Sequence, residues 1–274
     1  MVDPAHYRVE YAINPHMLDA QGRLREVDVT VARAQWTDLK NILMGLGSEV
    51  VVLPPVPGLP DMVFAANQSF PFIAPKTGRK TALISRMMST KRQPEVAYFE
   101  EWYRGNGYDV VRLENDKLKF EGNGDAVLHP GQNLIWGGFG FRSDEEVYGE
   151  IARRWDFQVI PLRLKLPEFY HLDTCFAILN QETVVVLPEA IEPDGFRQIK
   201  KVFKHVIELD HEECLKSFCA NCFSPNGQDV ILQKGSPILA KNLHQLGFRV
   251  HAIETEEFIK AGGSVFCLKM ALPG

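Results

Sequence analysis

The chain has 274 residues, of which 45% are hydrophobic and 24% charged, and its formal net charge is −5 at pH 7. This length and composition suffice for a large buried core. The negative charge and the absence of a long basic run exclude a typical nucleic-acid-binding surface, which needs a basic face. No stretch approaches the ~18 uninterrupted apolar residues of a membrane-spanning helix, so no membrane partner is expected.

The amino terminus and the cysteines indicate the compartment. Residues 1–7 lack the basic and then apolar pattern of a secretory signal peptide. The five cysteines form an odd set without a framework spacing, which fits a reducing compartment better than a disulfide scaffold. We therefore expect a cytoplasmic protein, and the sequence leaves open whether it forms a homo-oligomer.

A unit of helix and strand recurs along the chain. Five helix-like stretches are each followed by a short strand with a β-branched centre and a closing Leu or Ile. The expected helices are 27–46, 94–106, 144–155, 194–203 and 237–246, and the strands that follow them are 48–53, 108–113, 157–162, 204–209 and 248–253. A glycine in position to end the helix precedes three of these strands.

Two further strand-like runs precede each of the last four helices, so the complete unit is strand, strand, helix, strand. These runs are 63–72 and 81–86, 126–129 and 133–137, 174–179 and 183–187, and 218–223 and 229–233. The first helix is preceded only by the run 8–13, and the run 265–272 remains over at the other end of the chain.

Five copies of one unit, at a period of about fifty residues, indicate a closed circular array. The simplest closure adds the C-terminal strand 265–272 to the first unit, which leaves no free sheet edge. We therefore predict an α/β fold, a five-bladed α/β-propeller, in a single domain of residues 1–274. A doubly wound α/β sheet is the alternative, but it requires neither a leftover strand nor five repeats.

Reactive side chains stand at matching places in four of the units. Asp61 and Glu121 lie eight residues beyond the strands that close their units, and His171 lies nine residues beyond. At the same offset after the last strand, a glycine opens the run that leads to Cys267. Because a circular array brings matching positions to its axis, we expect these four side chains to meet. The fourth unit offers no titratable group at this place.

Cys267, His171 and Glu121 suit nucleophilic catalysis, which needs a thiolate, a general acid and base, and a group that orients the base. Gly262 and Gly263 permit a tight turn before the predicted strand that carries Cys267. Taken singly, each catalytic candidate has an ordinary interpretation as a core cysteine, a core histidine or a salt-bridged glutamate. Their matching repeat positions favour the functional interpretation.

The run 171–175 alternates as a strand, so His171, Asp173 and Cys175 would point to one face. Asp173 would then lie beside the histidine, where it could bind a cation. The same alternation makes Cys175 a second candidate nucleophile, which the spacing does not exclude.

A cysteine cluster in the fourth unit resembles a zinc site in composition; it consists of His211, Cys214, Cys219 and Cys222. If 218–223 is a strand, Cys219 and Cys222 face opposite sides and cannot share a metal ion. Core cysteines are the favoured interpretation, and no metal is expected. The glycine-rich runs 122–125 and 137–140 lack the lysine and the surroundings of a phosphate loop, so no nucleotide cofactor is expected either.

Several stretches carry a recognisable pattern that spans almost the whole chain. They are Pro-Asp-Met-Val-Phe at 60–64, Phe-Glu-Gly-Asn-Gly-Asp at 120–125, Gly-Gly-Phe-Gly-Phe-Arg at 137–142, His-Leu-Asp-Thr at 171–174 and Gly-Gly-Ser-Val-Phe-Cys at 262–267. With them the chain resembles the guanidino-group-modifying enzymes, which include arginine deiminase, dimethylarginine dimethylaminohydrolase, amidinotransferases and arginine dihydrolase. The resemblance implies a five-bladed propeller (the pentein fold), a nucleophilic Cys267 rather than Cys175, and no metal or organic cofactor.

Within this family the chain resembles arginine dihydrolase most. Dimethylarginine hydrolases usually carry two acids where this chain has Ala66 and Asn67, and Asp173 follows the histidine as it does in arginine deiminases. The stretch 9–17 and the Ala66-Asn67 pair look most like arginine dihydrolase, which converts arginine to ornithine, ammonia and carbon dioxide. The resemblance implies that Asn14 and Asn67 contact the substrate, and that the extra C-terminal domain of some relatives is absent. Dimethylarginine dimethylaminohydrolase and arginine deiminase are the alternatives.

The resemblance also implies a mechanism on a small guanidino substrate. Cys267 attacks the guanidinium carbon to form a covalent thiouronium, while His171, oriented by Glu121, protonates the departing amine and later activates water. Four further side chains would hold the substrate: Asp173 and Asp61 at the guanidinium, and Arg142 and Arg86 at the carboxylate. A propeller that binds a partner without chemistry is the alternative from another class, and the intact Cys, His and Glu set argues against it.

Overall fold

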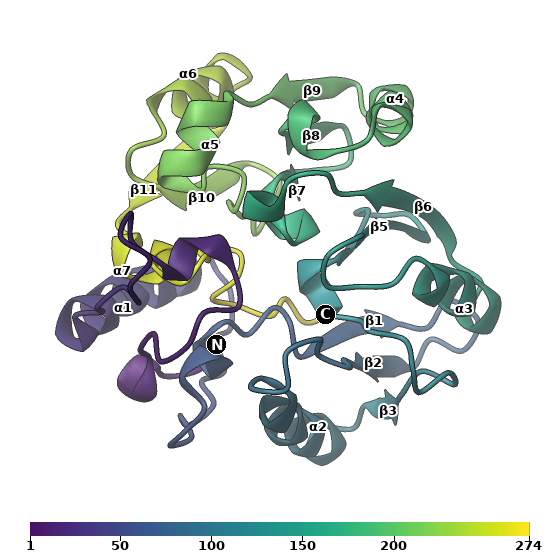
Figure 1. Ribbon diagram of the computed structural model, residues 1–274. Helices are drawn as coiled ribbons and strands as arrows, with labels where there is room; N and C mark the ends of the chain where they lie inside the picture. Colours follow the sequence, from purple (N-terminus) through teal and green to yellow (C-terminus); the bar gives the residue numbers. More distant parts are fainter. Residues whose placement is uncertain (274) are drawn as a thin grey trace.

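Three of the repeat units form three-stranded sheets of one topology in the computed structural model, which describes residues 1–273 (Figure 1). In each sheet the first two strands are antiparallel and the last two are parallel. The strands are β1 (Ser69–Ile73), β2 (Lys80–Ile84) and β3 (Asp109–Val111); β4 (Ala126–Leu128), β5 (Leu134–Phe139) and β6 (Gln158–Arg163); and β7 (Phe176–Ile178), β8 (Thr183–Val186) and β9 (His205–Glu208). Gly274, the last residue of the predicted domain, lies outside the described residues.

A helix connects the parallel strands of each unit, because parallel neighbours need a crossover. The crossover helices are α2 (Val96–Gly105), α3 (Glu146–Trp155) and α4 (Pro193–Val202), and in the fourth unit α6 (Pro237–Gln245) joins β10 (Asp229–Gln233) to β11 (Arg249–Ile253). The first unit contributes α1 (Val29–Gly45). Figure 1 shows the sheets around a common centre with these helices on the outer side. The predicted α/β fold and the five helices of the repeat are confirmed.

The first unit differs from the prediction, because neither 8–13 nor 48–53 forms a strand. Only an isolated parallel bridge between Val2 and Leu53 stands in their place. The amino-terminal residues, rather than the run 8–13, therefore lie beside Leu53.

The C-terminal run 265–272 also forms no strand, so the predicted closure by a strand is wrong. The run folds into a turn, in which the side chain of Asn221 accepts hydrogen bonds from the backbone N–H groups of Ser264 (3.0 Å) and Cys267 (3.2 Å). The side chain of Asn221 thus satisfies these two donors within the turn, and no strand among residues 1–273 pairs with them. One backbone bond, from Ala66 N to Cys267 O (3.2 Å), ties the turn to the segment before β1.

The fourth unit contains a helix that the sequence analysis did not predict, α5 (His211–Ser217). Asp210 caps its start, and Phe218 ends it in the left-handed region with φ 50°. The run 218–223 is therefore not a strand, and only Phe223 pairs with Ile231. The prediction that Cys219 and Cys222 face opposite sides of a strand is therefore wrong, because no strand forms there.

Short helices mark most of the remaining connections. A second unpredicted helix, α7 (Glu256–Ile259), is one turn long. The 3₁₀ helices are η1 (Pro4–His6), η2 (Pro15–Met17), η3 (Pro60–Val63), η4 (Gln93–Glu95), η5 (Gly122–Gly124), η6 (Pro167–Phe169), η7 (Leu172–Thr174) and η8 (Pro188–Ala190). Because η7 replaces the predicted alternation of 171–175, His171, Asp173 and Cys175 do not share a strand face.

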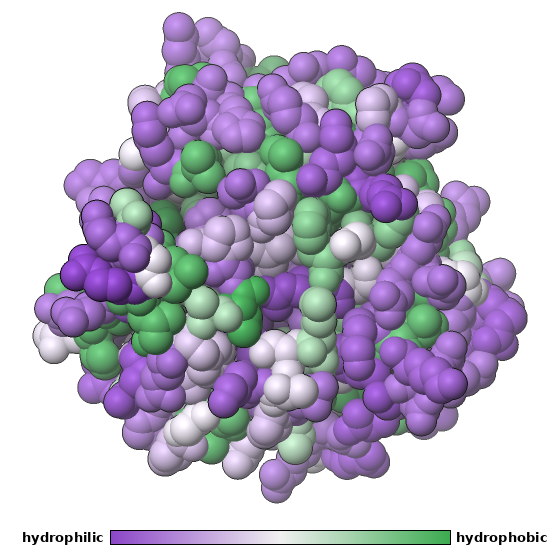
Figure 2. All heavy atoms as spheres, in the orientation of Figure 1, coloured by the Kyte–Doolittle hydropathy of each residue, from purple (hydrophilic) through white to green (hydrophobic). Residues whose placement is uncertain are grey.

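Apolar side chains fill the space between the sheets and their helices. Trp136, for example, is fully buried and stacks on Phe203, with Phe176 beside it. Burial of each such side chain contributes roughly 1.5–3 kcal/mol. On the face shown in Figure 2, hydrophilic side chains cover the rim, and apolar ones gather nearer the middle. Among residues 1–273, no helix is both long and apolar enough to cross a bilayer.

Candidate active site

Side chains from several units line one cavity between the sheets. Six of the nine predicted site residues are among them: Asn14, Asp61, Asn67, Arg142, His171 and Cys267. Two more, Glu121 and Asp173, are buried and contact His171 and Cys267 from behind. The matching offsets in the repeat therefore predicted this convergence correctly. The segment before each sheet supplies the residue: Asp61 lies in η3, Glu121 precedes η5 and His171 precedes η7.

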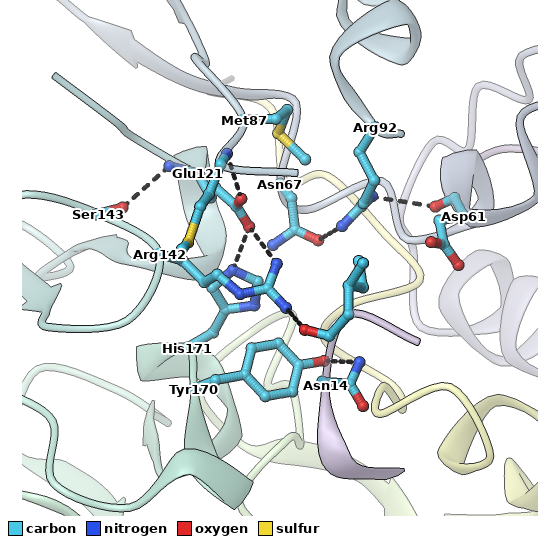
Figure 3. A network of polar contacts seen from close by, with 12 residues as sticks. Asn14, Asp61, Asn67, Met87, Arg92, Glu121, Arg142, Ser143, Tyr170 and His171 are labelled. Carbon is cyan, nitrogen blue, oxygen red and sulfur yellow. Dashed lines mark hydrogen bonds and ion pairs between the residues drawn. The ribbon is translucent and has the colours of Figure 1, made fainter. Parts of the chain in front are cut away.

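His171 and Glu121 form a buried pair. His171 Nε2 donates to Glu121 Oε2 at 2.7 Å, and the backbone N–H of Met88 donates to Oε1 at 2.9 Å (Figure 3). Burial alone would raise the pKa of Glu121, but the hydrogen bond and charge of His171, with Arg142 nearby, lower it to about 2. Glu121 is therefore ionised at neutral pH and fixes the orientation of the imidazole.

Cys267 lies between an acceptor and a donor. Its thiol donates to Asp173 Oδ2 at 3.2 Å, and Asn221 Nδ2 donates to Sγ at 3.2 Å. Burial, and then the negative charge of Asp173, raise the pKa of Cys267 well above its usual value. The thiol is therefore protonated at neutral pH, and a positive charge brought to the carboxylate would favour the thiolate.

Two glycines permit the turn that carries Cys267. Gly262 has φ +82°, and a Cβ there would lie 2.7 Å from the hydroxyl oxygen of Tyr170. A Cβ on Gly263 would lie 2.5 Å from Cε1 of Phe64. Only glycine fits this backbone conformation and this approach of neighbouring side chains.

Unpaired acceptors and one unpaired donor lie at the cavity or directly beside it. Both carboxylate oxygens of Asp61, Oδ1 of Asp173 and Nδ2 of Asn67 have no hydrogen-bond partner among residues 1–273. Burial raises the pKa of Asp61, although the charge of Arg92 opposes the rise. Buried polar groups without partners are costly and rare in native proteins. The carboxylate of Asp61 and the free Oδ1 of Asp173 therefore suit a ligand with several N–H donors and a positive charge.

Arg92, which the sequence analysis did not single out, lines the cavity. It donates to Glu95, to Asn67 Oδ1 at 2.9 Å and to the backbone oxygens of Asp61 and Phe64 at 3.2 Å. This guanidinium thereby fixes the loop that bears the carboxylate and amide of the site. The sequence offered one sign of this role: Arg92 stands three positions before Glu95, at the start of a short helix.

Arg86, by contrast, is not brought to the cavity. Its side chain is exposed, and its backbone pairs with Phe120. The family resemblance implied a carboxylate ligand here, but the side chain points to solvent.

An amino-terminal segment covers the cavity. Arg142 Nη2 donates to the backbone oxygen of Ile13 at 2.6 Å, and its guanidinium lies over the ring of Tyr170. Asn14 Nδ2 donates to the hydroxyl of Tyr170 at 3.2 Å (Figure 3). It also donates to the backbone oxygen of Ala261 at 2.9 Å. A ligand carboxylate at Arg142 would compete with the carbonyl of Ile13.

The fourth unit contributes Asn221, a second residue that the sequence analysis missed. Besides the bonds to the 264–267 turn, its Nδ2 donates to the backbone oxygen of Asp173 at 2.8 Å. The only signal was a polar amide within the apolar run 218–223.

The other cysteines lie away from the cavity. Cys175 is fully buried in the core, and burial raises its pKa well above the usual value. Cys214, Cys219 and Cys222 belong to the same core cluster, with 3.1 Å between the sulfurs of Cys214 and Cys219. Among residues 1–273, no three His, Cys, Asp or Glu side chains are placed to hold a metal ion.

Comparison with known proteins agrees with this geometry. Residues 7–272 match the family model described as N,N dimethylarginine dimethylhydrolase, eukaryotic. The chain belongs to this dimethylarginine dimethylhydrolase family. Among its relatives, the bifunctional arginine dihydrolase/ornithine cyclodeaminase AgrE of Nostoc sp. is 35% identical over 98% of the chain and 37% of its own length. The N(G),N(G)-dimethylarginine dimethylaminohydrolase of Mycobacterium tuberculosis is 33% identical over 99% of the chain and 84% of its own length.

The family resemblance extends to solved structures. The N-terminal domain of a variant of ArgZ, a cyanobacterial arginine dihydrolase crystallised with substrate, has a TM-score of 0.88 and 33% identity. The alignment covers 98% of this chain and 95% of that domain. The chain thus spans about 37% of the length of the bifunctional relatives, and in the ArgZ structure it matches the N-terminal domain.

Proposed function

We propose that this chain is a cysteine-dependent hydrolase of small guanidino compounds, and that its reaction is that of an arginine dihydrolase. The observation that carries the proposal is the junction of two sets of groups in one cavity. One set is the thiol of Cys267 with the His171–Glu121 pair, and the other is the unpaired carboxylate of Asp61 with the buried Asp173 beside Cys267, whose Oδ1 has no partner. The relatives named for arginine dihydrolase support the same reaction.

The polar groups of the cavity suit a substrate with a cation at one end and a carboxylate at the other. Asp61 and Oδ1 of Asp173 accept N–H groups of the guanidinium, which supplies the partners that these oxygens lack. Arg142 exchanges the carbonyl of Ile13 for the substrate carboxylate. Asn14 holds the covering segment in place through Ala261.

Binding of the substrate guanidinium favours the thiolate form of Cys267. Its positive charge at Asp173 offsets part of the repulsion that disfavours the thiolate, so Cys267 transfers its proton to His171 as the substrate binds. The sulfur then forms a bond to the guanidinium carbon. The bond from that carbon to a terminal nitrogen breaks, and His171 gives its proton to the departing ammonia.

Hydrolysis of the thiouronium completes the first half of the reaction. His171, now neutral, takes a proton from water, whose oxygen attacks the same carbon and displaces the sulfur. A second attack at this carbon, with a second water, releases the second ammonia, carbon dioxide and ornithine. Every step uses side chains of this chain alone.

Asn67 favours the dihydrolase reaction over release of methylamine. Arg92 occupies its Oδ1, which leaves Nδ2 as a free donor. A Cβ built on Gly124 would lie 2.3 Å from Nδ2 of Asn67 and 3.4 Å from Cγ of His171. The amide of Asn67 and the imidazole of His171 are therefore close neighbours. A neutral donor there suits the new carbonyl oxygen of the first product, whereas the buried Ala66 offers no carboxylate for a methylated guanidinium.

We also propose the five-bladed propeller as the full description of the fold. The four sheets around one centre and the Val2–Leu53 bridge beside α1 support it. Arg86 as a carboxylate ligand, the single domain and the cytoplasmic location stay predictions.

Product analysis tests the proposed reaction. The chain is incubated with arginine, citrulline and methylated arginines, and ammonia, citrulline, ornithine and methylamines are measured. Ornithine from arginine without free citrulline is expected; citrulline alone would assign a deiminase, and dimethylamine from dimethylarginine a dimethylaminohydrolase. Cys267→Ser is the matched control and should abolish turnover. If no compound gives a product and a haloamidine does not label Cys267, the chain is a non-catalytic binding module.

A further inference from the structure

The side-chain amide of Asn67 is held in one of its two orientations. Its Oδ1 accepts a hydrogen bond from Arg92 Nη1 at 2.9 Å, whereas its Nδ2 has no partner among residues 1–273. A guanidinium offers only donors, so the amide atom that faces Arg92 has to be the oxygen. Figure 3 shows Asn67 between Arg92 and the His171–Glu121 pair. The NH2 group therefore lies on the side of the catalytic candidates because an arginine stands on the other side.

Arg92 is itself fixed by a closed ring of hydrogen bonds. Its Nε donates to the two carboxylate oxygens of Glu95 at 3.1 and 3.2 Å, and its Nη2 donates to Oε2 at 3.0 Å. Gln68, which directly follows Asn67, donates from Nε2 to the same Oε2 at 2.6 Å. All four side chains of the ring are at most 3% exposed. The guanidinium cannot turn away from Asn67 without breaking several buried hydrogen bonds.

The same guanidinium leaves the free groups of the cavity untouched. Its Nη2 donates to the backbone oxygens of Asp61 and Phe64 at 3.2 Å, so it binds the loop and not the carboxylate of Asp61. Both carboxylate oxygens of Asp61 stay without a partner among residues 1–273, as does Nδ2 of Asn67. Arg92 thus fixes the pattern of acceptors and donors at this end of the cavity without using any of them.

We propose that Arg92 is a positioning residue that determines which product the site releases, because it keeps the NH2 group of Asn67 directed at the reacting carbon. After the first hydrolysis this carbon carries an oxygen in place of a nitrogen. The NH2 group donates to that oxygen and retains the first product for the second attack. In the reversed orientation, the amide oxygen of Asn67 would repel it. This role in product release rests on the proposed function, whereas the orientation of the amide can be measured without any substrate.

The first test measures the two products from arginine in Arg92→Lys. A lysine keeps a positive charge beside Glu95 but lacks the planar fork, so it cannot hold Glu95 and Asn67 at once. The fraction of turnovers that end in free citrulline should rise roughly tenfold, which corresponds to the loss of about one hydrogen bond. A looser fold alone would slow the reaction without changing the ratio of citrulline to ornithine. An unchanged ratio therefore overturns the proposal.

Asn67→Asp provides the matched control, since an aspartate presents an acceptor in either orientation. This variant should release citrulline by itself. Addition of Arg92→Lys should then change the ratio of citrulline to ornithine no further, because the two residues act through one group. A further change of the ratio in the double variant would show that Arg92 acts by another route, and would overturn the proposal.

The last test needs neither turnover nor a folded Arg92→Lys. In the wild-type chain, the side-chain NH2 resonances of Asn67 are assigned by their loss in Asn67→Asp. Nuclear Overhauser contacts are expected between these protons and the imidazole Hδ2 of His171, and their absence would contradict the assigned orientation. If the contacts are present but the wild-type chain makes no product, the proposed function falls, and only the role of Arg92 in orienting the amide stands.

Discussion

Asn221 donates a hydrogen bond from Nδ2 to the sulfur of Cys267 at 3.2 Å and accepts one from the backbone N–H of the same cysteine at 3.2 Å. One amide from the fourth unit therefore fixes both the backbone and the thiol of the candidate nucleophile. The same side chain binds the backbone of Ser264 and Asp173, so it joins the thiol to the carboxylate that faces it.

Asn221→Ala should lower both stability and reactivity. The change leaves the N–H groups of Ser264 and Cys267 buried without partners, which costs about 1–3 kcal/mol for each group. Urea unfolding should show a loss of several kcal/mol, and the rate of Cys267 alkylation by iodoacetamide should fall. A stable variant with an unaltered alkylation rate would show that Asn221 does not position the thiol.

Asn221→Asp separates the two roles of the amide. An aspartate keeps an acceptor for the two N–H groups but loses the donor to the sulfur and adds a negative charge beside it. The pKa of Cys267 should therefore rise, and alkylation at a fixed pH should slow more than stability falls. Alkylation against pH, followed by intact mass, measures this.

Glu121→Gln tests the pair with His171. The variant keeps the shape of the side chain but loses the charge, so kcat should fall by roughly 10²–10⁴-fold, as expected for loss of general acid and base catalysis. Because the pKa of Glu121 is about 2, its protonation cannot produce an acid limb between pH 5 and 8 in the wild-type profile. Activity near the wild-type level in Glu121→Gln would remove the carboxylate from the proposed mechanism.

Gly262→Ala should disturb the site, and Gly247→Ala is its matched control. Both glycines have a left-handed φ, +82° and +84°, so each alanine costs about 1–2 kcal/mol in backbone strain. A Cβ on Gly262 also meets Tyr170 and Asn14, whereas a Cβ on Gly247 meets nothing within 4 Å. Both variants should melt earlier, but only Gly262→Ala should raise KM. Equal effects on KM would argue against a role for the 262 turn in substrate binding.

Truncation to alanine should lower the stability strongly at Arg92 and hardly at all at Arg86. Arg92→Ala leaves the buried Glu95 without its ion-pair partner, and such a loss typically costs 3–5 kcal/mol, so about 4 kcal/mol is expected. Arg86→Ala removes an exposed side chain and should change the unfolding free energy by less than about 0.5 kcal/mol. Chemical unfolding of both variants is the measurement, and a large loss of turnover in a stable Arg86→Ala would restore the predicted carboxylate ligand.

Buried carboxyl groups should make the chain more stable at mildly acidic pH. Burial raises the pKa of Glu95 to about 7, of Asp125 to about 6 and of Asp173 to about 7. These groups bind protons more tightly in the folded state, so the unfolding free energy falls as pH rises from about 4 to 7. The pKa values of His16 and the Met1 amine are lowered in the folded state, so these two groups make the unfolding free energy rise slightly with pH. Urea unfolding at pH 5 and at pH 7.5 measures the unfolding free energy under both conditions. A higher stability at pH 7.5 would contradict the expectation.

The sequence by itself determined the repeat and most of the site. Helix positions followed from apolar periodicity and glycine stops, which are local features. Asp61, Glu121, His171 and Cys267 were found because repeated units place matching positions at one centre. Eight of the nine predicted site residues line the cavity or contact residues that do.

Only the tertiary structure decided the details that depend on distant partners. The pattern of 265–272 predicts a strand, but Asn221, more than forty residues away, accepts the N–H groups of Ser264 and Cys267 and stabilises a turn instead. Arg92 rather than Arg86 reaches the cavity, because the chain between β2 and α2 turns one side chain inward and the other to solvent. Periodicity reports which side chains are buried, whereas the partners of a buried polar group are set by the packing of the whole chain.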